Sequence, residues 1–287
     1  MHFLIVYFTG TYNTLRVVNN IKANLKDHEV DVIDVAKRKI DDVSNYDHLI
    51  ICYPIYAFNA PKPIIDFAKN IKKLEKEMTC LIMKQSGEYL FWNNASSLKL
   101  ISILKKKNIK VTNEHHYLLP YSFVFRHSDF MAYRMDQTLT QLLPIDLEEY
   151  LANKEHHLKR YFLDRFIAFI FRIQWWGGRI NGKHYKVDKT KCVLCKKCIQ
   201  ECPSQNIEYK DDKFVFHNKC LMCERCVMYC PTHAIKAGLF DSWRVDAPYT
   251  FKEAPYQKEV KPNYCKKSYE RYFKLAEEKI QKHNNKL

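Results

Sequence analysis

CVLCKKCIQECP, residues 192–203, and CLMCERCVMYCP, residues 220–231, share the cysteine spacing CxxCxxCxxxCP. Three thiolates spaced by two residues on one tight loop can each bind a different iron of a cubane cluster. The fourth thiolate, which precedes proline, then points away from that cluster and towards a second one. The spacing therefore predicts two [4Fe-4S] clusters with crossed ligand sets, one held by Cys192, Cys195, Cys198 and Cys230 and the other by Cys220, Cys223, Cys226 and Cys202.

The two motifs are also similar outside their cysteines, which indicates an internal duplication. Lys191 and Lys219 precede the first cysteines, and Ile207 and Ile235 each fall five residues after the last ones. Structural zinc is the main alternative, because CxxC pairs also form four-cysteine sites. A run of three cysteines with a fourth before proline, found twice, has no zinc rationale. Over about residues 183–240 the sequence resembles bacterial two-cluster ferredoxins.

The first residues, MHFLIVYF at positions 1–8, lead directly into a strand pattern. They lack the basic start and the small-residue cleavage site of a signal peptide. We therefore expect a reducing, cytoplasmic location, in which thiols stay available for iron and disulfides are disfavoured.

The composition bounds size and partners. A length of 287 residues predicts about two domains, and no stretch is long and apolar enough to span a membrane. The formal net charge of +15 favours acidic partners, which are an electron-carrier protein, an anionic lipid surface or nucleic acid. An ordinary lysine-rich solvated surface is an equal alternative. Nucleic acid is the least favoured partner, because no stripe of Lys and Arg interleaved with aromatics and no recognition motif occurs.

A polar segment follows the first apolar run. Residues 3–8, FLIVYF, predict a strand buried on both faces of a parallel sheet. Hydroxyls and backbone amides at the start of the next helix form an anion site, made here by Thr9, Gly10, Thr11, Tyr12, Asn13 and Thr14. The patterns GxxxxGK[ST] and GxGxxG are both absent. The alternative is a plain N-cap formed by Asn13 or Thr14.

Strands and helices alternate along the next hundred residues. Strands are predicted over 29–35, 47–53 and 79–83 and from Ile109, with helices over 63–74 and 95–107. This alternation predicts an α/β fold with a doubly wound parallel sheet. Two further loops fall where such sheets bind ligands, and their candidate residues are Pro54, Tyr56, Phe58 and Asn59 in one, and Gln85, Ser86, Gly87 and Tyr89 in the other.

With these loops, residues 1 to about 145 resemble a flavodoxin. Thr9, Thr11, Asn13 and Thr14 match the T-x-T-x-N-T phosphate loop. The resemblance implies FMN, with its phosphate at residues 9–14, its ring stacked on Tyr56 or Phe58, and residues 85–89 on the other side. Three features depart from the family. Tyr12 stands where flavodoxins often carry glycine, the third loop lacks their usual acidic character, and the net charge has the opposite sign.

The remaining parts are a linker and a C-terminal extension. Residues 161–176, YFLDRFIAFIFRIQWW, predict a helix that ends at Gly177 and Gly178. We expect it to pack between the two domains, and an amphipathic helix lying on a membrane surface is the alternative. A last helix is expected over 266–283, and Cys52, Cys80 and Cys265 are expected to be plain thiols.

The whole chain resembles the flavodoxin-like, ferredoxin-fused proteins of anaerobic bacteria. The boundaries that follow are 1–145 for an FMN-binding domain, 146–182 for a helical linker, 183–240 for a two-cluster ferredoxin domain and 241–287 for the extension. This domain order implies an FMN- and iron–sulfur-dependent oxidoreductase or electron-transfer protein. A soluble ferredoxin-like donor would reduce the clusters, which pass single electrons to FMN and on to an unknown acceptor.

No acid, base or nucleophile constellation emerges in the loops, so no catalytic residue is predicted. A second hypothesis is a basic binding or sensory module with structural clusters, whose partner is a membrane surface or nucleic acid.

Overall fold

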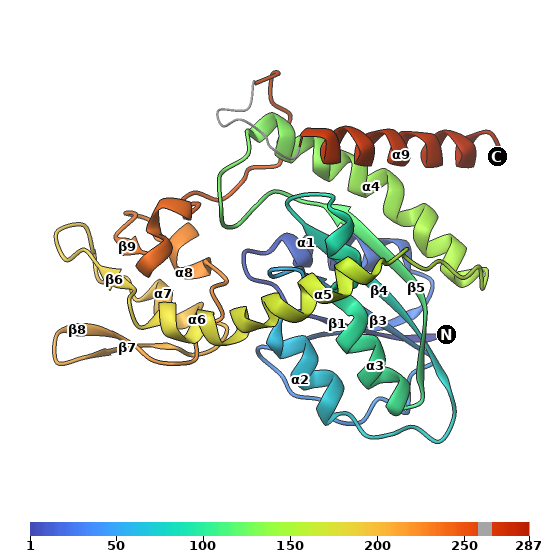
Figure 1. Ribbon diagram of the computed structural model, residues 1–287, viewed down its shortest axis with the longest axis horizontal. Coiled ribbons are helices and arrows are strands. Elements are labelled where there is room, and N and C mark those ends of the chain that lie inside the picture. The colour runs from blue at the N-terminus through green and yellow to red at the C-terminus, as the bar shows by residue number, and fades with distance from the viewer. Residues whose placement is uncertain (258–265, 287) are drawn as a thin grey trace.

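The computed structural model describes residues 1–257 and 266–286. A larger sheet domain and a smaller cysteine-rich domain lie side by side, and helices connect them along one side of the molecule (Figure 1). Cys265, expected to be a plain thiol, lies outside the described residues.

A parallel sheet forms the centre of the larger domain. Its order is β2-β1-β3-β4-β5, with β1 at His2–Tyr7, β2 at Glu29–Asp34, β3 at His48–Pro54, β4 at Met78–Ser86 and β5 at Ile109–Leu118. All neighbouring strands run parallel. This is the flavodoxin-like order, and it confirms the predicted fold class. The order reverses between β1 and β3, so a crevice is expected at the carboxyl ends of these strands.

Helices cover both faces of the sheet. One face carries α1 (Asn13–Asn24), α4 (Asp129–Leu151) and α9 (Lys266–Asn284), and the other carries α2 (Lys62–Asn70) and α3 (Leu98–Lys106). Alternate residues of β1 serve the two cores, since Phe3 and Ile5 pack under α1 while Leu4 and Val6 pack under α2. The continuous apolar run of β1 is therefore buried on both sides, as predicted.

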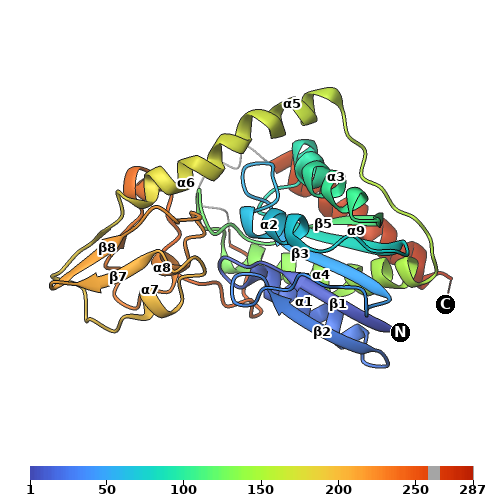
Figure 2. The same cartoon turned by 90° about the horizontal axis from the view of Figure 1, so that it is seen from below.

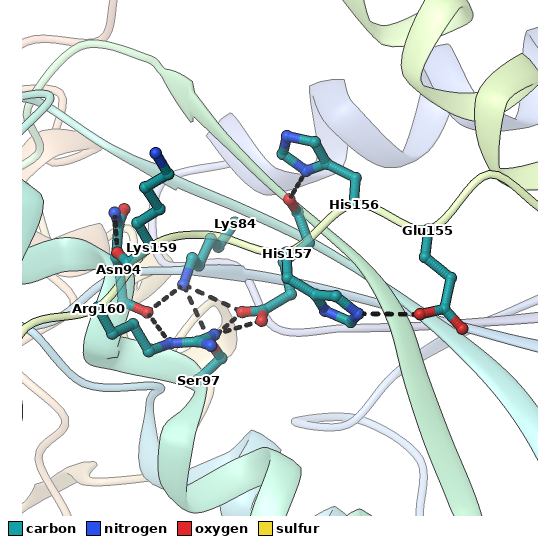
Figure 3. A network of polar contacts seen from close by, with 9 residues as sticks. Lys84, Asn94, Ser97, Glu155, His156, His157, Lys159 and Arg160 are labelled. Atoms are coloured by element: carbon teal, nitrogen blue, oxygen red, sulfur yellow. Dashed lines mark hydrogen bonds and ion pairs between the residues drawn. The ribbon is translucent and has the colours of Figure 1, made fainter.

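Strand β4 is longer than predicted. It extends to Ser86, so Lys84, Gln85 and Ser86 belong to the strand and not to a loop. Lys84 is fully buried, and Figure 3 shows its ammonium group among Ser97, Asn94 and Arg160. Its Nζ donates to Ser97 Oγ at 2.9 Å and to Asn94 O at 3.1 Å, and lies 3.6 Å from the buried Glu114 carboxylate. A charged side chain at the end of this strand is tolerated because it is fully paired.

The helical linker predicted over residues 146–182 is interrupted, and the interruption was not predicted. Helix α4 ends at Leu151, and Asn153 adopts a left-handed conformation with φ of 57°. Residues 154–160 then run beside β5, where His156 N donates to Thr112 O and Glu114 N donates to His156 O. Arg160, at the end of this segment, donates to Asn94 O at 2.9 Å and forms an ion pair with Glu114 (Figure 3).

The linker consists of α5 (Phe162–Ile170), the 3-10 turn η2 (Phe171–Ile173) and α6 (Gln174–Gly182). Helix α6 continues through Gly177 and Gly178, so the predicted end at these glycines is wrong. In Figure 2 the two helices lie along the outer edge of both domains. We expected the apolar side chains of the linker to be buried between the two domains. On the outer side of the linker this prediction is wrong, because Phe162 there is 85% exposed. No helix in the described ranges is long and apolar enough to cross a membrane.

The smaller domain has approximate internal repetition, which supports the predicted duplication. Each cysteine motif leads into a one-turn helix, α7 (Lys197–Gln200) and α8 (Arg225–Met228), and short strands follow or flank each motif: β6 (Lys186–Val187), β7 (Ile207–Lys210), β8 (Lys213–Phe216) and β9 (Ile235–Lys236). A 3-10 segment, η3 (Gly238–Trp243), follows. Equivalent backbone amides, Asn206 N and Ala234 N, each donate to a cysteine Sγ at 3.3 Å.

Candidate cluster and flavin sites

The first cysteine set converges as the crossed assignment requires. One pocket is lined by Cys192, Cys195, Cys198 and Cys230, together with Lys196, Lys197 and Pro231. Burial, together with the neighbouring thiolates of Cys195, Cys230 and Cys192, raises the pKa of Cys198 to about 11. Cys230 therefore lies beside the first motif although it belongs to the second.

The second set converges in the same way. Burial raises the pKa of Cys226 well above its usual value, and Cys223, Cys220 and Cys202 act on it in the same direction. Cys202, from the first motif, also raises the pKa of Cys220 and Cys223. Within the described residues no three or more His, Cys, Asp and Glu side chains are placed to share a single metal ion. A cubane uses a different arrangement, in which each thiolate binds its own iron.

The cysteine surroundings fit anionic clusters. Amide N–H groups point at three sulfurs, from Met222 to Cys220 at 3.4 Å and from Asn206 and Ala234 to Cys202 and Cys230. Such bonds favour the charged thiolate and lower the charge density on a bound cluster. The ligand roles of the eight cysteines stay predictions, and the structure provides both the convergence and the amides that those roles need.

The predicted phosphate loop touches the cysteine-rich domain directly. Arg225 lies between Cys223 and Cys226 in sequence and is only 2% exposed. Its Nε donates to Gly10 O and its Nη2 to Thr9 O, both at 2.6 Å. Tyr229 Oη donates to Thr11 O at 3.3 Å. Three successive carbonyl oxygens of the loop are therefore held by the other domain.

This contact determines where the loop amides point. In a trans peptide the N–H group lies opposite the carbonyl of the preceding residue. Because the carbonyls of residues 9–11 face Arg225 and Tyr229, the N–H groups of Gly10, Thr11 and Tyr12 face the opposite way. Successive amides on one side of a loop, before a helix N-terminus, form an anion-binding nest.

Tyr12 does not crowd this nest. It has φ of 68°, the left-handed region that favours glycine, which accounts for the glycine that flavodoxins carry there. Its hydroxyl donates to the Glu201 carboxylate, and its ring packs edge-on against Tyr229 and under Arg225. Burial and the bond to Glu201 raise the pKa of Tyr12 to about 12. The side chain therefore belongs to the domain contact.

Gly10 leaves no room for a side chain. A Cβ atom there would lie 2.5 Å from Tyr56 Oη and 2.9 Å from Cys223 O. The first loop, the second loop and the second cysteine motif thus meet at this one residue.

Some side chains of the loop are hydrogen-bonded within the protein, and others keep a group that could bind a ligand. Thr11 Oγ1 bonds Ser122 Oγ at 2.5 Å, and Asn13 Nδ2 donates to Pro120 O at 2.8 Å. Thr14 Oγ1 accepts from Gln85 Nε2 at 2.6 Å, so its own proton is free to be donated. Helix α1 has no side-chain cap, so the alternative of a plain N-cap is wrong.

Two buried polar atoms at this place lack a protein partner. Among the described residues, no hydrogen bond is made by Thr9 Oγ1 or by Gln85 Oε1. Buried polar groups are normally satisfied, so unpartnered ones mark a place for a ligand group. Together with the amide nest, these atoms fit a phosphate and a polar edge of a flavin.

Residues of the second loop contact two different parts of the protein, the phosphate loop and the linker. Pro54 ends β3, and Tyr56 lies at Gly10 and packs near Cys223. Phe58 instead packs edge-on against Trp92 and Phe171 at 5.6 and 5.2 Å. Asn59 is buried and donates to Ala168 O of α5 at 2.8 Å. Phe58 and Asn59 therefore hold the linker, whereas the sequence suggested that they contact flavin.

Most of the predicted residues in the third loop contact β5, α9 or the segment after β5, and not the phosphate loop. Ser86 Oγ bonds His116 Nε2 at 2.7 Å, and Gly87 packs against the Tyr121 ring. Tyr89 stacks on His116 and is tilted against Tyr272 of α9, with centroid distances of 5.1 Å in both cases. Of the predicted residues in this region, Gln85 is the one bonded to the phosphate loop. Residues 85–89 were expected to line the other side of the flavin, but Ser86, Gly87 and Tyr89 pack on His116, Tyr121 and α9 instead.

Sequence reasoning missed the residues that join the domains. They are Arg225, Tyr229 and Glu201 from the cysteine-rich domain, and Trp175 from the linker. Trp175 packs against the same apolar core of the sheet domain as Tyr56 and Cys223, and its buried Nε1 has no partner within residues 1–257 and 266–286. The position of Arg225 between two cysteines was visible in the sequence, but no pattern there indicates its partner 215 residues away.

Comparisons with known proteins agree with the two domains. Residues 4–86 match the family model described as a flavodoxin domain, and residues 191–235 match that of a 4Fe-4S dicluster domain. The chain therefore combines a flavodoxin domain with a ferredoxin domain of the 4Fe-4S dicluster type. This pairing indicates an electron-transfer protein of the flavin and iron–sulfur class. No curated protein matches the chain.

Solved structures resemble the sheet domain. A flavodoxin from Streptococcus pneumoniae TIGR4 is 14% identical, with 52% of this chain and 99% of that chain covered and a TM-score of 0.38. A short-chain flavodoxin associated with a non-canonical PDU bacterial microcompartment is 16% identical, with coverages of 52% and 98% and a TM-score of 0.38. A flavoprotein in complex with FMN from Lactobacillus acidophilus NCFM is 17% identical, with coverages of 40% and 92% and a TM-score of 0.31. At these identities the similarity concerns the fold alone and does not show that this chain binds FMN.

Proposed function

We propose that this chain is an electron-transfer protein in which two [4Fe-4S] clusters and one FMN exchange single electrons and serve an external acceptor. The observation that carries the proposal is the contact between the second cysteine motif and the phosphate loop. Arg225 donates to Thr9 and Gly10, and Cys223 lies against Gly10. When bound, the clusters supply one-electron transfer and FMN supplies transfer of one or two electrons.

The chain's own residues would bind and position these groups. The N–H groups of residues 10–12 and the hydroxyls of Thr9 and Thr14 would hold the phosphate. Tyr56 and Gln85 lie next to the same loop, and we expect them to contact the ring. No acid, base or nucleophile is assigned, because the cofactors carry the chemistry.

The first cysteine set is the exposed one. Cys195 of this set is exposed, whereas the other seven cysteines of the two motifs are half-buried. Four exposed lysines, Lys189, Lys191, Lys196 and Lys197, surround the first motif. We expect an acidic electron-carrier protein to dock here, because a positive patch attracts and orients a negative partner.

Anaerobic reconstitution followed by a redox titration tests the function. We expect about eight irons and one FMN per chain, since two cubanes hold four irons each. Cluster and flavin signals, followed together by EPR and absorption, should both respond to an added electron donor. About four irons per chain would contradict the two-cluster assignment. Absence of FMN from the reconstituted chain would contradict the flavin part.

A pair of variants separates the flavin site from the clusters. Thr9→Val and Thr14→Val remove the hydroxyls assigned to the phosphate and leave the cysteines untouched. We expect FMN affinity to fall with unchanged iron content. Thr140→Val, at an exposed position on α4, is the control. Equal FMN binding by all four proteins would place the phosphate elsewhere.

A further inference from the structure

The linker exposes a continuous apolar surface. We call it the α5–α6 ridge, and its exposed side chains are Phe162, Leu163, Phe166, Phe169, Ile170, Ile173, Trp176 and Ile180. Phe162 is 85%, Ile173 70% and Trp176 64% exposed. Single exposed apolar residues are ordinary, but a contiguous group of this size marks an interaction surface.

The ridge is fixed in this orientation from its inner side. Asn59 Nδ2 donates to Ala168 O at 2.8 Å, and Gln174 Nε2 donates to Tyr56 O at 3.1 Å. Asn181 Nδ2 donates to Ala237 O at 3.1 Å. Polar bonds at three points along the linker therefore hold the inner side against both domains, and the apolar side chains cannot turn inward without breaking them.

The exposed charges on the ridge are all positive. Asp164 is the one acidic residue between positions 162 and 182, and it is buried and accepts from Tyr161 N at 2.8 Å. Arg165 is exposed, and Arg172 and Arg179 are half-buried. Lys159 and Lys183 are exposed at the two ends of the linker. The surface thus combines aromatic and aliphatic side chains with positive charge and offers no exposed negative group.

The ridge is a protruding edge. Figure 2 shows α5 and α6 running along the outside of the molecule, past both domains. Phe91 and Trp92 are exposed beside it, and Phe91 packs edge-on against Tyr161 at 6.2 Å. A protruding, positively charged surface with aromatic side chains suits a flat anionic layer, and Trp and Phe favour the headgroup boundary.

We propose that the α5–α6 ridge binds the surface of an anionic lipid bilayer, with the helices lying in the plane of the headgroups. The apolar side chains enter the boundary of the acyl chains, while the arginines stay with the lipid phosphates. The linker does not cross the bilayer, in keeping with its length and charges. Both domains then stand on one side of the membrane.

Vesicle co-sedimentation with the full, cofactor-loaded chain tests the proposal. The vesicles contain phosphatidylcholine alone or phosphatidylcholine and phosphatidylglycerol in equal parts. We expect binding to the mixed vesicles, at least about tenfold weaker binding to the neutral ones, and weakening but not loss at high salt. Equal binding to both compositions, or no binding to either, would overturn the proposal.

Variants decide whether the ridge is the surface that binds. A triple change, Phe162→Ser, Phe166→Ser and Ile173→Ser, should weaken binding to mixed vesicles by more than about tenfold. Arg165→Gln should reduce it less and remove part of its salt dependence. Leu275→Ser and Lys274→Gln, which are exposed on α9, are the matched controls and should change nothing. The triple variant should keep the far-ultraviolet spectrum and iron content of the parent.

A protein occupant of the ridge gives a different result. If the chain forms dimers in solution and the triple variant becomes monomeric while vesicle binding is unchanged, the ridge is a self-association surface and the lipid proposal fails. Loss of vesicle binding in the control variants would assign binding to the α9 surface or to general charge and would likewise overturn the lipid proposal.

Discussion

Arg225 connects the two domains through the backbone of the phosphate loop. Its guanidinium is buried and donates to carbonyls of Thr9, Gly10 and Glu201. Charge-assisted bonds of this kind are worth more than neutral ones, and their loss would leave buried carbonyls unpaired. The orientation of the amides that we assign to the phosphate therefore depends on a residue that does not itself belong to the proposed phosphate site.

Replacing Arg225 by methionine should weaken FMN binding. We expect the dissociation constant for FMN to rise about tenfold or more, because an unpaired buried group costs about 1–3 kcal/mol. Flavin fluorescence quenching measures the affinity, and iron analysis shows whether the cluster survives. Tyr229→Phe removes a single longer bond and should have a smaller effect. An Arg225→Met chain with intact iron and unchanged FMN affinity would disprove the positioning role.

Pairs of cysteine variants test the crossed ligand sets. Cys195→Ser with Cys230→Ser removes two ligands of one predicted cluster, and about four irons per chain should remain. Cys223→Ser with Cys230→Ser removes one ligand from each cluster, so most of the iron should be lost. Iron content after reconstitution, together with EPR, distinguishes the two results. The reverse pattern would mean that each motif holds its own cluster.

At the scale of elements, the strands were predictable and the loop contacts were not. Continuous apolar runs such as residues 3–8, alternating with helical patterns, predicted buried parallel strands and the fold class, and the order of the strands came from the structure. Phe58 and Tyr89 were predicted to contact flavin because their loops lie at the correct sheet edge. Their rings instead pack on Phe171 and Tyr272, which come from helices far along the chain.

The buried network at the end of β4 should be important for stability. Glu114→Gln leaves the buried charges of Lys84 and Arg160 without their carboxylate. Breaking one partner of a buried ion pair costs about 3–5 kcal/mol, so the free energy of unfolding should fall by that amount. Urea unfolding followed by circular dichroism measures it.

The control for this change lies close by in Figure 3. Glu155 is exposed and pairs with His157 and Lys110. Glu155→Gln should alter the free energy of unfolding by no more than about 1 kcal/mol, because exposed pairs contribute little. Equal effects of the two variants would show that the buried network is not stabilising.

Buried histidines around β5 and before α4 should make the sheet domain sensitive to acid. Burial lowers the pKa of His115 to about 4 and of His127 to about 3, and that of His116 well below its usual value of 6.5. The unfolded chain therefore binds protons that the folded chain does not, so stability falls as the pH drops from about 6.5 towards 4.

Urea unfolding between pH 7 and pH 4.5 measures this dependence, in steps of about half a unit. His127→Gln keeps a neutral polar group at the site and should flatten the slope by up to about 1.4 kcal/mol per pH unit. His157→Gln, at an exposed position, should leave the slope as it is. A parent chain whose stability does not change over this range would contradict the prediction.

At the scale of the whole molecule, the contact between domains is the part that the sequence did not reveal. Domain order and cofactor types follow from local motifs at residues 9–14 and 192–231. The pairing of Arg225 with Thr9 and of Tyr12 with Glu201 depends on surfaces brought together only by folding. Each domain was recognised separately from its own motifs, and neither recognition says which surfaces of the two domains meet.

Removing iron should therefore weaken FMN binding. The loop of residues 220–226 presents Arg225, and we expect the cluster to fix that loop. After chelation, the FMN dissociation constant of the parent chain should rise, measured by fluorescence quenching. The Arg225→Met chain should show a smaller further change, because the connecting bonds are already absent. An FMN affinity that is unaffected by chelation in the parent would contradict this coupling.

The enclosed contact at Arg225 also has a kinetic consequence. The two cofactor sites are held against each other by buried bonds, so under the proposed function electron exchange between them is unimolecular. Its rate is then independent of protein concentration and nearly independent of ionic strength, since buried charges are poorly screened. Under the same proposal, delivery by an acidic carrier at Lys196 and Lys197 would be bimolecular and would slow as salt rises. We therefore expect a salt-sensitive entry step and a salt-insensitive internal step.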